Sequence, residues 1–199
     1  MQTKYFFSLM CICVLLQTSL SRAQAQESVK TEKEYRIKPE LVPQKAKDFI
    51  ATFTENKSFK WLQEVGDDGT SLEAKFRYKG QRYSVEFTKD GVLEDIEIVI
   101  GLGELPEETK QEITSYFTQE FDYFKVEKIQ AQYNNTVKEI INRTAKNLVS
   151  SSPIPHYEVV VKTRNSSEKS KRYEVLFNEK GAFISRSQVS VRRDNILRF

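Results

Sequence analysis

The chain has 199 residues, of which 39% are hydrophobic and 30% are charged, a balance typical of a globular protein rather than a disordered or fibrous one. Lys and Arg total 31 and Asp and Glu total 28, so the formal net charge is only +3. Lys4 and Arg22 are the only charged residues among the first 25, so the remainder is close to neutral. Charge therefore gives no reason to expect nucleic acid or an anionic membrane as a partner.

The first 25 residues have the pattern of a secretory signal peptide. Lys4 gives a positive start, residues 5–16 form an apolar run, and Ala23 and Ala25 are small residues where a signal peptidase cuts. The run is shorter than the roughly 20 apolar residues of a membrane-spanning helix. We therefore predict cleavage after Ala25 and a periplasmic or secreted protein with no membrane span. A lipoprotein signal with Cys11 as the lipid-bearing residue is the alternative, and the short stretch before that cysteine disfavours it.

Removal of this segment also removes both cysteines, Cys11 and Cys13. The mature chain then has no disulfide, no thiol nucleophile and no cysteine ligand for a metal. Its stability must come from the burial of apolar surface.

Residues 26–40 are polar and charged, which predicts a tether before the first folded unit, residues 41–101. Pro43 suits the first turn of an amphipathic helix, whose apolar residues recur with helical spacing (Ala46, Phe49, Ile50 and Phe53). Four segments with alternating apolar and polar residues follow, separated by turns that mostly contain glycine (59–65, 71–78, 82–88 and 92–100). This period of two predicts an antiparallel meander with one buried face.

A second unit repeats this order over residues 102–193. The motif Tyr-x-Val-x-Phe-x-x-x-Gly occurs at 83–91 and again, residue for residue, at 173–181, and Pro106 precedes the second helix. The second unit is longer, mainly because residues 135–149 have the apolar spacing of an inserted helix, and residues 194–199 form a tail. The sequence thus predicts an α+β fold of two tandem repeats, each a helical segment packed on an antiparallel four-stranded meander sheet.

The chain resembles the PepSY-like family, the β-lactamase-inhibitor-like proteins of Gram-negative bacteria. The resemblance rests on a signal peptide followed by two copies of the same order: a helix that begins with an aliphatic residue and Pro, a strand with Phe or Trp, and a Tyr-x-Val-x-Phe-x-x-x-Gly hairpin. The matching segments are residues 42–98 and 105–189, about three quarters of the chain. The resemblance implies two α+β units whose paired sheets form a concave surface that grips a partner protein. It brings no catalytic residues, and the inserted helix departs from the family's simple repeat.

Residues suited to chemistry are scarce. His156 is the only histidine, and no cysteine, serine elbow or second histidine accompanies it, so a structural or incidental role is expected. Glu94, Asp95 and Glu97 share one strand, whereas a calcium site usually draws its oxygens from a loop, so we interpret them as a solvated strand face. We predict that the protein is not an enzyme and has no catalytic residues, no metal site and no cofactor.

Five residues are candidates for contact with a partner: Tyr123, Tyr133, Val137, Ile141 and Leu148. The two tyrosines have the parity opposite to that of Phe124 and Val126, which predicts the open sheet face. The other three lie on the apolar side of the inserted helix, which either binds the partner or only covers the sheet.

The leading hypothesis is a non-enzymatic extracytoplasmic binding protein. It would act as a protein inhibitor or interaction module through its open sheet faces, with an envelope or extracellular protein as partner. The alternative is a small-ligand sensor or carrier with a pocket between the repeats, which would need an apolar cleft with a few polar groups.

Overall fold

Both helices expected from the Pro-initiated pattern are present in the computed structural model, which describes residues 27–30, 33–52, 59–66, 69–134, 154–166 and 168–189. Helix α1 spans Gln44–Ala51 and α2 spans Glu107–Glu120, each capped by a proline. Short 3-10 turns precede them, η1 at Pro39–Leu41 and η2 at Leu102–Glu104. Two glutamates in the first turn of α2 suit the positive end of its helix dipole.

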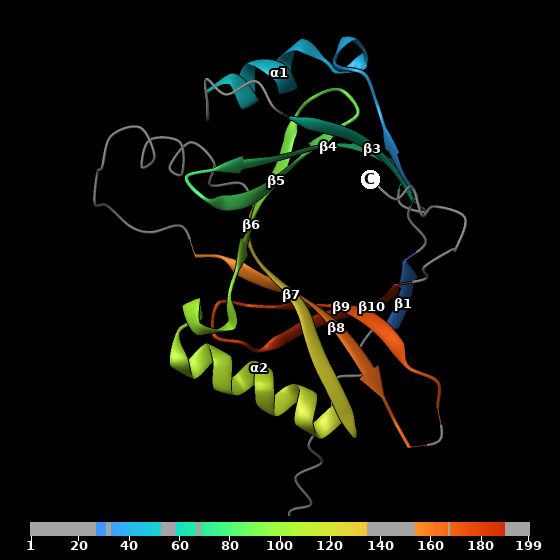
Figure 1. Cartoon of the computed structure of the whole chain (residues 1–199), viewed down its shortest axis with the longest axis vertical. Coiled ribbons are helices and arrows are strands. Elements are labelled where there is room, and N and C mark those ends of the chain that lie inside the picture. Colours follow the sequence, from blue (N-terminus) through green and yellow to red (C-terminus); the bar gives the residue numbers. More distant parts are fainter. Residues whose placement is uncertain are drawn as a thin grey trace, which may run out of the picture.

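Ten strands form one sheet, in the order β1-β10-β9-β8-β7-β6-β5-β4-β3-β2 (Figure 1). Neighbours from β2 to β10 run antiparallel, and β1 is added parallel to β10 at one edge. The strands are β1 Glu27–Lys30, β2 Lys33–Arg36, β3 Lys60–Gly66, β4 Gly69–Tyr78, β5 Gln81–Thr88, β6 Leu93–Ile100, β7 Tyr123–Asn134, β8 His156–Arg164, β9 Lys171–Phe177 and β10 Phe183–Val189.

The expected fold class, two repeats with a four-stranded sheet each, is wrong. Strands β6 and β7 pair directly from Asp95–Asn134 to Ile100–Ile129, so the sheet continues from one half to the other. This pairing satisfies backbone groups that two separate sheets would each leave open at an edge. Residues 26–40, expected to be a tether, contribute β1 and β2 at the two outer edges. The fold is therefore dominated by one continuous sheet.

Both helices lie on the outer side of the bent sheet, α1 over the first half and α2 over the second (Figure 1). Each helix seals a separate apolar core against the strands beneath it. Phe87 and Phe177 are the fully buried centres of these cores, with 0% exposure each. The ring of Phe49 in α1 packs edge-on against Phe87 at 5.6 Å, and the ring of Phe117 in α2 packs against Phe177 at the same centroid distance.

The glycine that closes each sequence motif explains how hairpin and helix dock. Gly91 has φ +79° and Gly181 has φ +84°, a region that L side chains rarely adopt. A Cβ on Gly91 would lie 2.8 Å from Pro43 Cβ, and one on Gly181 would lie 2.6 Å from the carbonyl oxygen of Thr109. The hairpin backbone therefore rests directly on the start of the helix. In the second half the Thr109 hydroxyl also donates to the Glu179 carbonyl at 2.9 Å.

The signal peptide (1–25), the inserted helix (135–149) and the tail (194–199) all fall outside the described residues. Within the described ranges, neither helix has both the length and the apolar character for crossing a membrane.

Candidate binding face

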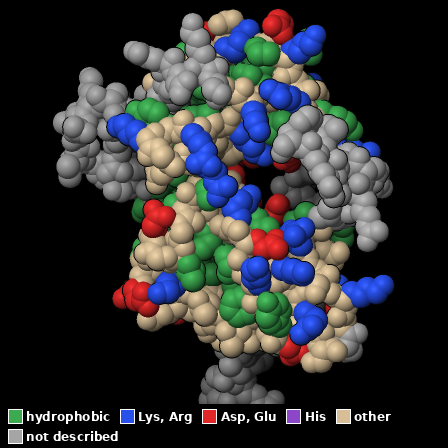
Figure 2. All heavy atoms as spheres, in the orientation of Figure 1, with side chains coloured by type: hydrophobic (Ala, Val, Ile, Leu, Met, Phe, Trp, Pro, Cys, Tyr) green, Lys and Arg blue, Asp and Glu red, His purple; other side chains and the backbone are tan. Residues whose placement is uncertain are grey.

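The side of the sheet opposite the helices is the concave face. Strand side chains alternate between the two sides, so the residues between core positions point to this face. It turns toward the middle of the molecule in Figure 1. Figure 2 shows Lys and Arg side chains gathered around the middle of the side in view, with acidic side chains between them beside a hollow. Charged residues such as Glu73, Arg77 and Glu97 alternate with core residues along the strands, so the concave face is polar, in contrast to the two aromatic cores behind the sheet.

An acidic stripe crosses the concave face through four carboxylates: Glu73 of β4, Glu86 of β5, and Asp95 and Glu97 of β6. Glu73 lies opposite Glu86, and Glu86 lies opposite Asp95, in the strand register. Glu73, Asp95 and Glu97 are at most 8% exposed. The interpretation of Asp95 and Glu97 as a solvated strand face is therefore wrong. The register shift between β5 and β6 sets Glu94 apart from them, exposed to solvent.

Three polar side chains bind these carboxylates. The Ser84 hydroxyl donates to Glu73, the Gln130 amide donates to Glu97, and the Gln132 amide donates to Asp95 at 3.1 Å. Buried carboxylates need such donors because transfer of an unpaired charge out of water is costly. The stripe is therefore a built polar network across β4, β5, β6 and β7.

Burial raises the pKa of Glu97 well above its usual range, and the neighbouring carboxylates of Glu158, Glu86 and Asp95 raise it further. Lys128 acts in the opposite direction but does not offset them. The stripe thus favours retention of a proton, or another positive charge, at Glu97.

Glu73 differs from Glu97 because a lysine side chain pairs with it. Burial raises its pKa despite the ammonium of Lys75, which lies 2.8 Å from its carboxylate. Burial alone would lower the pKa of Lys75, but Glu73 and Glu34 together raise it. Lys75 also reaches Glu34 at 3.0 Å, so this ion pair ties β2 to β4.

Positively charged residues also lie next to one another on neighbouring strands. Arg77 lies opposite Arg82, both exposed, and Lys162 lies between Lys125 on β7 and Arg172 on β9. Like charges directly opposite each other destabilise a sheet by a few tenths to about 1 kcal/mol per pair. The Glu127 carboxylate lies 2.6 Å from the Arg172 guanidinium and offsets part of the positive charge of the second group. The concave face therefore carries like-charged neighbours of both signs, some of them bridged by ion pairs.

The two candidate tyrosines lie on different sides of the sheet. Tyr123 is 50% exposed and shares the side of Lys125. A β-bulge at Glu127 shifts the alternation by one residue, so Tyr133 packs against the second core instead of facing the concave side. The parity argument is therefore wrong for Tyr133. Val137, Ile141 and Leu148 lie outside the described residues.

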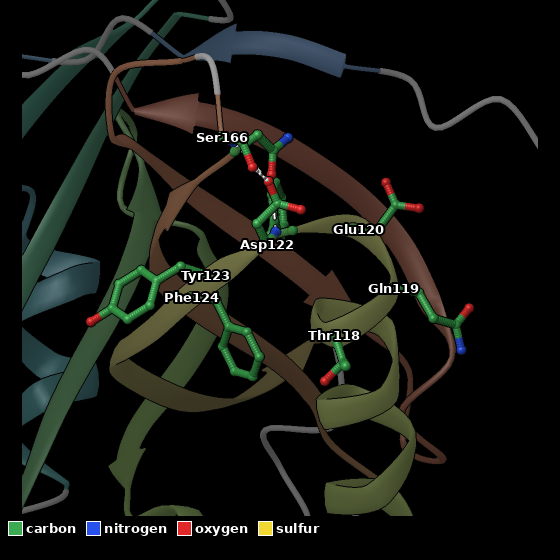
Figure 3. A pocket seen from close by; sticks show the side chains of 9 residues that line it. Thr118, Gln119, Glu120, Asp122, Tyr123, Phe124 and Ser166 are labelled. Atoms are coloured by element: carbon green, nitrogen blue, oxygen red, sulfur yellow. Dashed lines mark hydrogen bonds between the residues drawn. The ribbon is translucent and has the colours of Figure 1, made fainter.

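Tyr123 also borders a surface pocket of about 640 Å³ at the end of α2 (Figure 3). Asp122 accepts hydrogen bonds from the hydroxyl and backbone N–H of Ser166 at 2.5 and 2.7 Å, which lowers the pKa of that carboxyl. The Arg164 guanidinium lies 5.6 Å from the Tyr123 ring centroid. The lining comes from the second half of the chain alone: Thr118, Gln119, Glu120, Phe121, Asp122, Tyr123, Phe124, Asn165 and Ser166.

His156 begins β8 opposite Gln132 and is half-buried. Sequence reasoning did not single out Glu86, which joins Asp95 and Glu97 across two strands. The polar parity of β5 was visible in the sequence, but only the register of β5 against β6 brings these carboxylates together.

No family model and no curated protein matches the chain. Three solved structures are similar to the chain, at 15% sequence identity each. A DUF2874 family protein from Bacteroides ovatus superposes with a TM-score of 0.51 over 78% of this chain and 93% of its own. A protein from Bacteroides eggerthii, provisionally described as periplasmic, gives 0.50 over 74% and 88%. A BLIP-like protein from Bacteroides fragilis gives 0.48 over 77% and 91%. The likeness to the first two shows a shared fold.

Proposed function

We propose that this chain is a non-enzymatic, extracytoplasmic binding protein that holds a protein partner on the concave face of its sheet. The observation that carries the proposal is the placement of like charges opposite each other on that face. Like charges face each other across strands in the acidic stripe and in the opposed pairs Arg77–Arg82 and Lys125–Lys162. This arrangement disfavours the free protein, although Lys75 and Glu127 offset part of the repulsion. A partner with complementary charges would relieve that repulsion, and complementary charge also raises the association rate.

Location outside the cytoplasm is supported by the predicted signal peptide of residues 1–25. Tyr123, exposed on the same side of β7, belongs to the proposed surface. Val137, Ile141 and Leu148 remain predictions from the sequence for the same partner.

A small-ligand carrier is supported less well. Ligand pockets are mostly apolar and enclosed. The pocket beside Tyr123 is lined by one half of the chain, whereas the carrier hypothesis needs a pocket between the halves. A catalytic role for His156 has little support, because no nucleophile lies opposite it in the strand register.

The test is capture of partners from an envelope extract of the source cells by the immobilised mature protein. The double variant Arg77→Glu/Arg82→Glu reverses charge on the concave face, and Lys45→Glu/Lys47→Glu makes the same change on α1, on the outer side. We expect the parent and the α1 variant each to retain one protein in stoichiometric amount. The concave-face variant should not retain it, and high salt should release it from the parent. Equal retention by both variants would refute the concave face as the site. A co-purifying small molecule without a protein would favour the carrier.

A further inference from the structure

The centre of the acidic stripe brings three carboxylates unusually close. Glu86, Asp95 and Glu97 each offer an oxygen, and these atoms lie within 4.8 Å of one another. Asp95 is 8% exposed and Glu97 is 6% exposed, so water screens their repulsion poorly. Added positive charge, either protons or a cation, stabilises carboxylates that lie this close together.

A neighbouring amide distinguishes between these. Gln130 of β7 is 4% exposed, and its Nε2 donates to the Glu97 carboxylate, so the amide group points into the cluster. Its Oε1 is buried and accepts no hydrogen bond from any described residue. A buried oxygen without a donor costs about 1–3 kcal/mol. A proton on Glu97 could satisfy this oxygen only if the amide turned over and gave up the Nε2 hydrogen bond to Glu97, whereas a cation beside the carboxylates could bind it with that bond intact.

We propose that Glu86, Asp95, Glu97 and the Oε1 of Gln130 form a calcium site on the concave face, with water completing the coordination. All four donors are oxygens, which suits a hard cation rather than zinc or copper. Calcium binds oxygens at about 2.3–2.6 Å, so two on opposite sides of the ion lie about 4.6–5.2 Å apart. Oxygens that all lie within 4.8 Å of one another can therefore share one calcium ion. Magnesium gives up its water reluctantly and is usually held by one or two carboxylates with several waters, so three carboxylates and an amide oxygen suit calcium better.

The site would join β5, β6 and β7 near the point where the two halves of the sheet meet. The Lys128 ammonium, which lies 4.0 Å from the Glu158 carboxylate and also lowers the pKa of Glu97, competes with a cation for the negative charge. With few protein ligands, the affinity should match that of extracellular modules, about 10⁻⁴–10⁻³ M. The inference does not depend on the proposed protein partner.

The experiment is calorimetric titration of the mature protein with CaCl₂ after removal of metal with EDTA, with MgCl₂ in a parallel titration. We expect saturable calcium binding at one site and weaker magnesium binding. Loss of outer-sphere contacts alone weakens metal sites by roughly 10–100-fold, so Glu97→Gln should weaken calcium at least tenfold. Glu94→Gln, an exposed carboxylate on the same strand, is the matched control and should bind as the parent does.

Circular dichroism would confirm that the variants fold, and Glu86→Gln replaces Glu97→Gln if the latter does not. Absence of saturable binding up to about 10 mM calcium, an order of magnitude above the expected affinity, would overturn the proposal. Equal affinities for the Glu97→Gln and Glu94→Gln variants, or for calcium and magnesium, would overturn it as well.

Discussion

The seating of the β9–β10 hairpin on α2 can be tested at a single atom. Gly181→Ala adds a Cβ at φ +84°, 2.6 Å from the Thr109 carbonyl oxygen and 2.9 Å from Glu112 Cβ. Gly80→Ala is the matched control, because Gly80 has φ +85° but nothing within 4 Å of the added atom. The two substitutions share the same backbone strain and differ in the contact with the helix.

The magnitudes follow from these distances. An alanine in the left-handed region costs about 1–2 kcal/mol, part of which is offset because alanine restricts the unfolded chain. We therefore expect Gly80→Ala to lower the free energy of unfolding by about 1 kcal/mol. The Thr109 oxygen belongs to the helix backbone and cannot move alone, so overpacking adds about 1–3 kcal/mol for Gly181→Ala.

Urea titration followed by far-ultraviolet circular dichroism measures this difference. With a typical urea dependence of about 1–3 kcal/mol per molar, the midpoint of Gly181→Ala should lie roughly 1 M below that of Gly80→Ala. Equal midpoints would refute the docking of this hairpin on α2. They would also remove the structural reason for the glycine that ends the sequence motif.

Four further outcomes are expected. Gly91→Ala should behave as Gly181→Ala does, because its Cβ would lie 2.8 Å from a proline side chain on α1, and the same urea titration checks it. Phe87→Ala and Phe177→Ala should each cost about 3–5 kcal/mol of unfolding free energy, since both rings are fully buried; a loss below about 1 kcal/mol at either would contradict the cores described. Burial raises the pKa of Glu97 above the ordinary 4.5, so the folded protein holds this proton more tightly than the unfolded chain does. The stability that the Glu97 side chain contributes is therefore greatest below pH 4.5 and is lost as the pH rises through the raised pKa. Glu97→Gln should therefore be more stable than the parent at pH 7 in EDTA, with no gain at pH 4, and thermal melts that show no gain at pH 7 would count against the burial effect. His156→Ala should leave the profile of a broad hydrolase panel unchanged, and an activity of the parent that disappears in the variant would contradict the non-enzymatic proposal.

Local structure could be predicted from the sequence because it depends on short-range patterns. The apolar spacing after Pro43 and Pro106 predicted α1 and α2, and the period of two predicted β3 to β6 within about one to two residues at most ends. The motif glycines also marked the two hairpins that touch the helices. Each of these features depends on residues that are neighbours in the chain.

The continuity of the sheet could not be predicted in this way. Strand β7 pairs with β6 after a connection that includes all of α2, and nothing in the pattern of either strand says which edge it joins. Strands β1 and β2 were missed for another reason. Edge strands have much of their surface in water, so their sequences stay polar and read as a tether.

A bulge accounts for the wrong side assigned to Tyr133. Glu127 is an extra residue in β7, and it moves Tyr133 to the core side of the sheet. Glu94 is an extra residue in β6, and it does not join Asp95 and Glu97 in the acidic stripe. A bulge leaves no mark in the composition of a strand, because it changes only which residues pair with the neighbouring strand. A count of alternating residues along the sequence therefore misses it. Residues beyond a bulge are therefore assigned to the opposite side of the sheet.

The two sides of the sheet differ in how they affect stability, and this difference favours the concave side as the functional one. On the outer side, Phe87 and Phe177 are fully buried under the helices, and the hairpin glycines fit closely against them. On the concave side, Glu97 is buried among other carboxylates, and Arg77 faces Arg82. Neutral or alternating residues at these positions would stabilise the sheet, so folding does not account for them. Groups whose pKa is shifted by burial and by like charges cluster at functional sites. A cation or a charged partner that binds the concave side would convert this repulsion into binding energy.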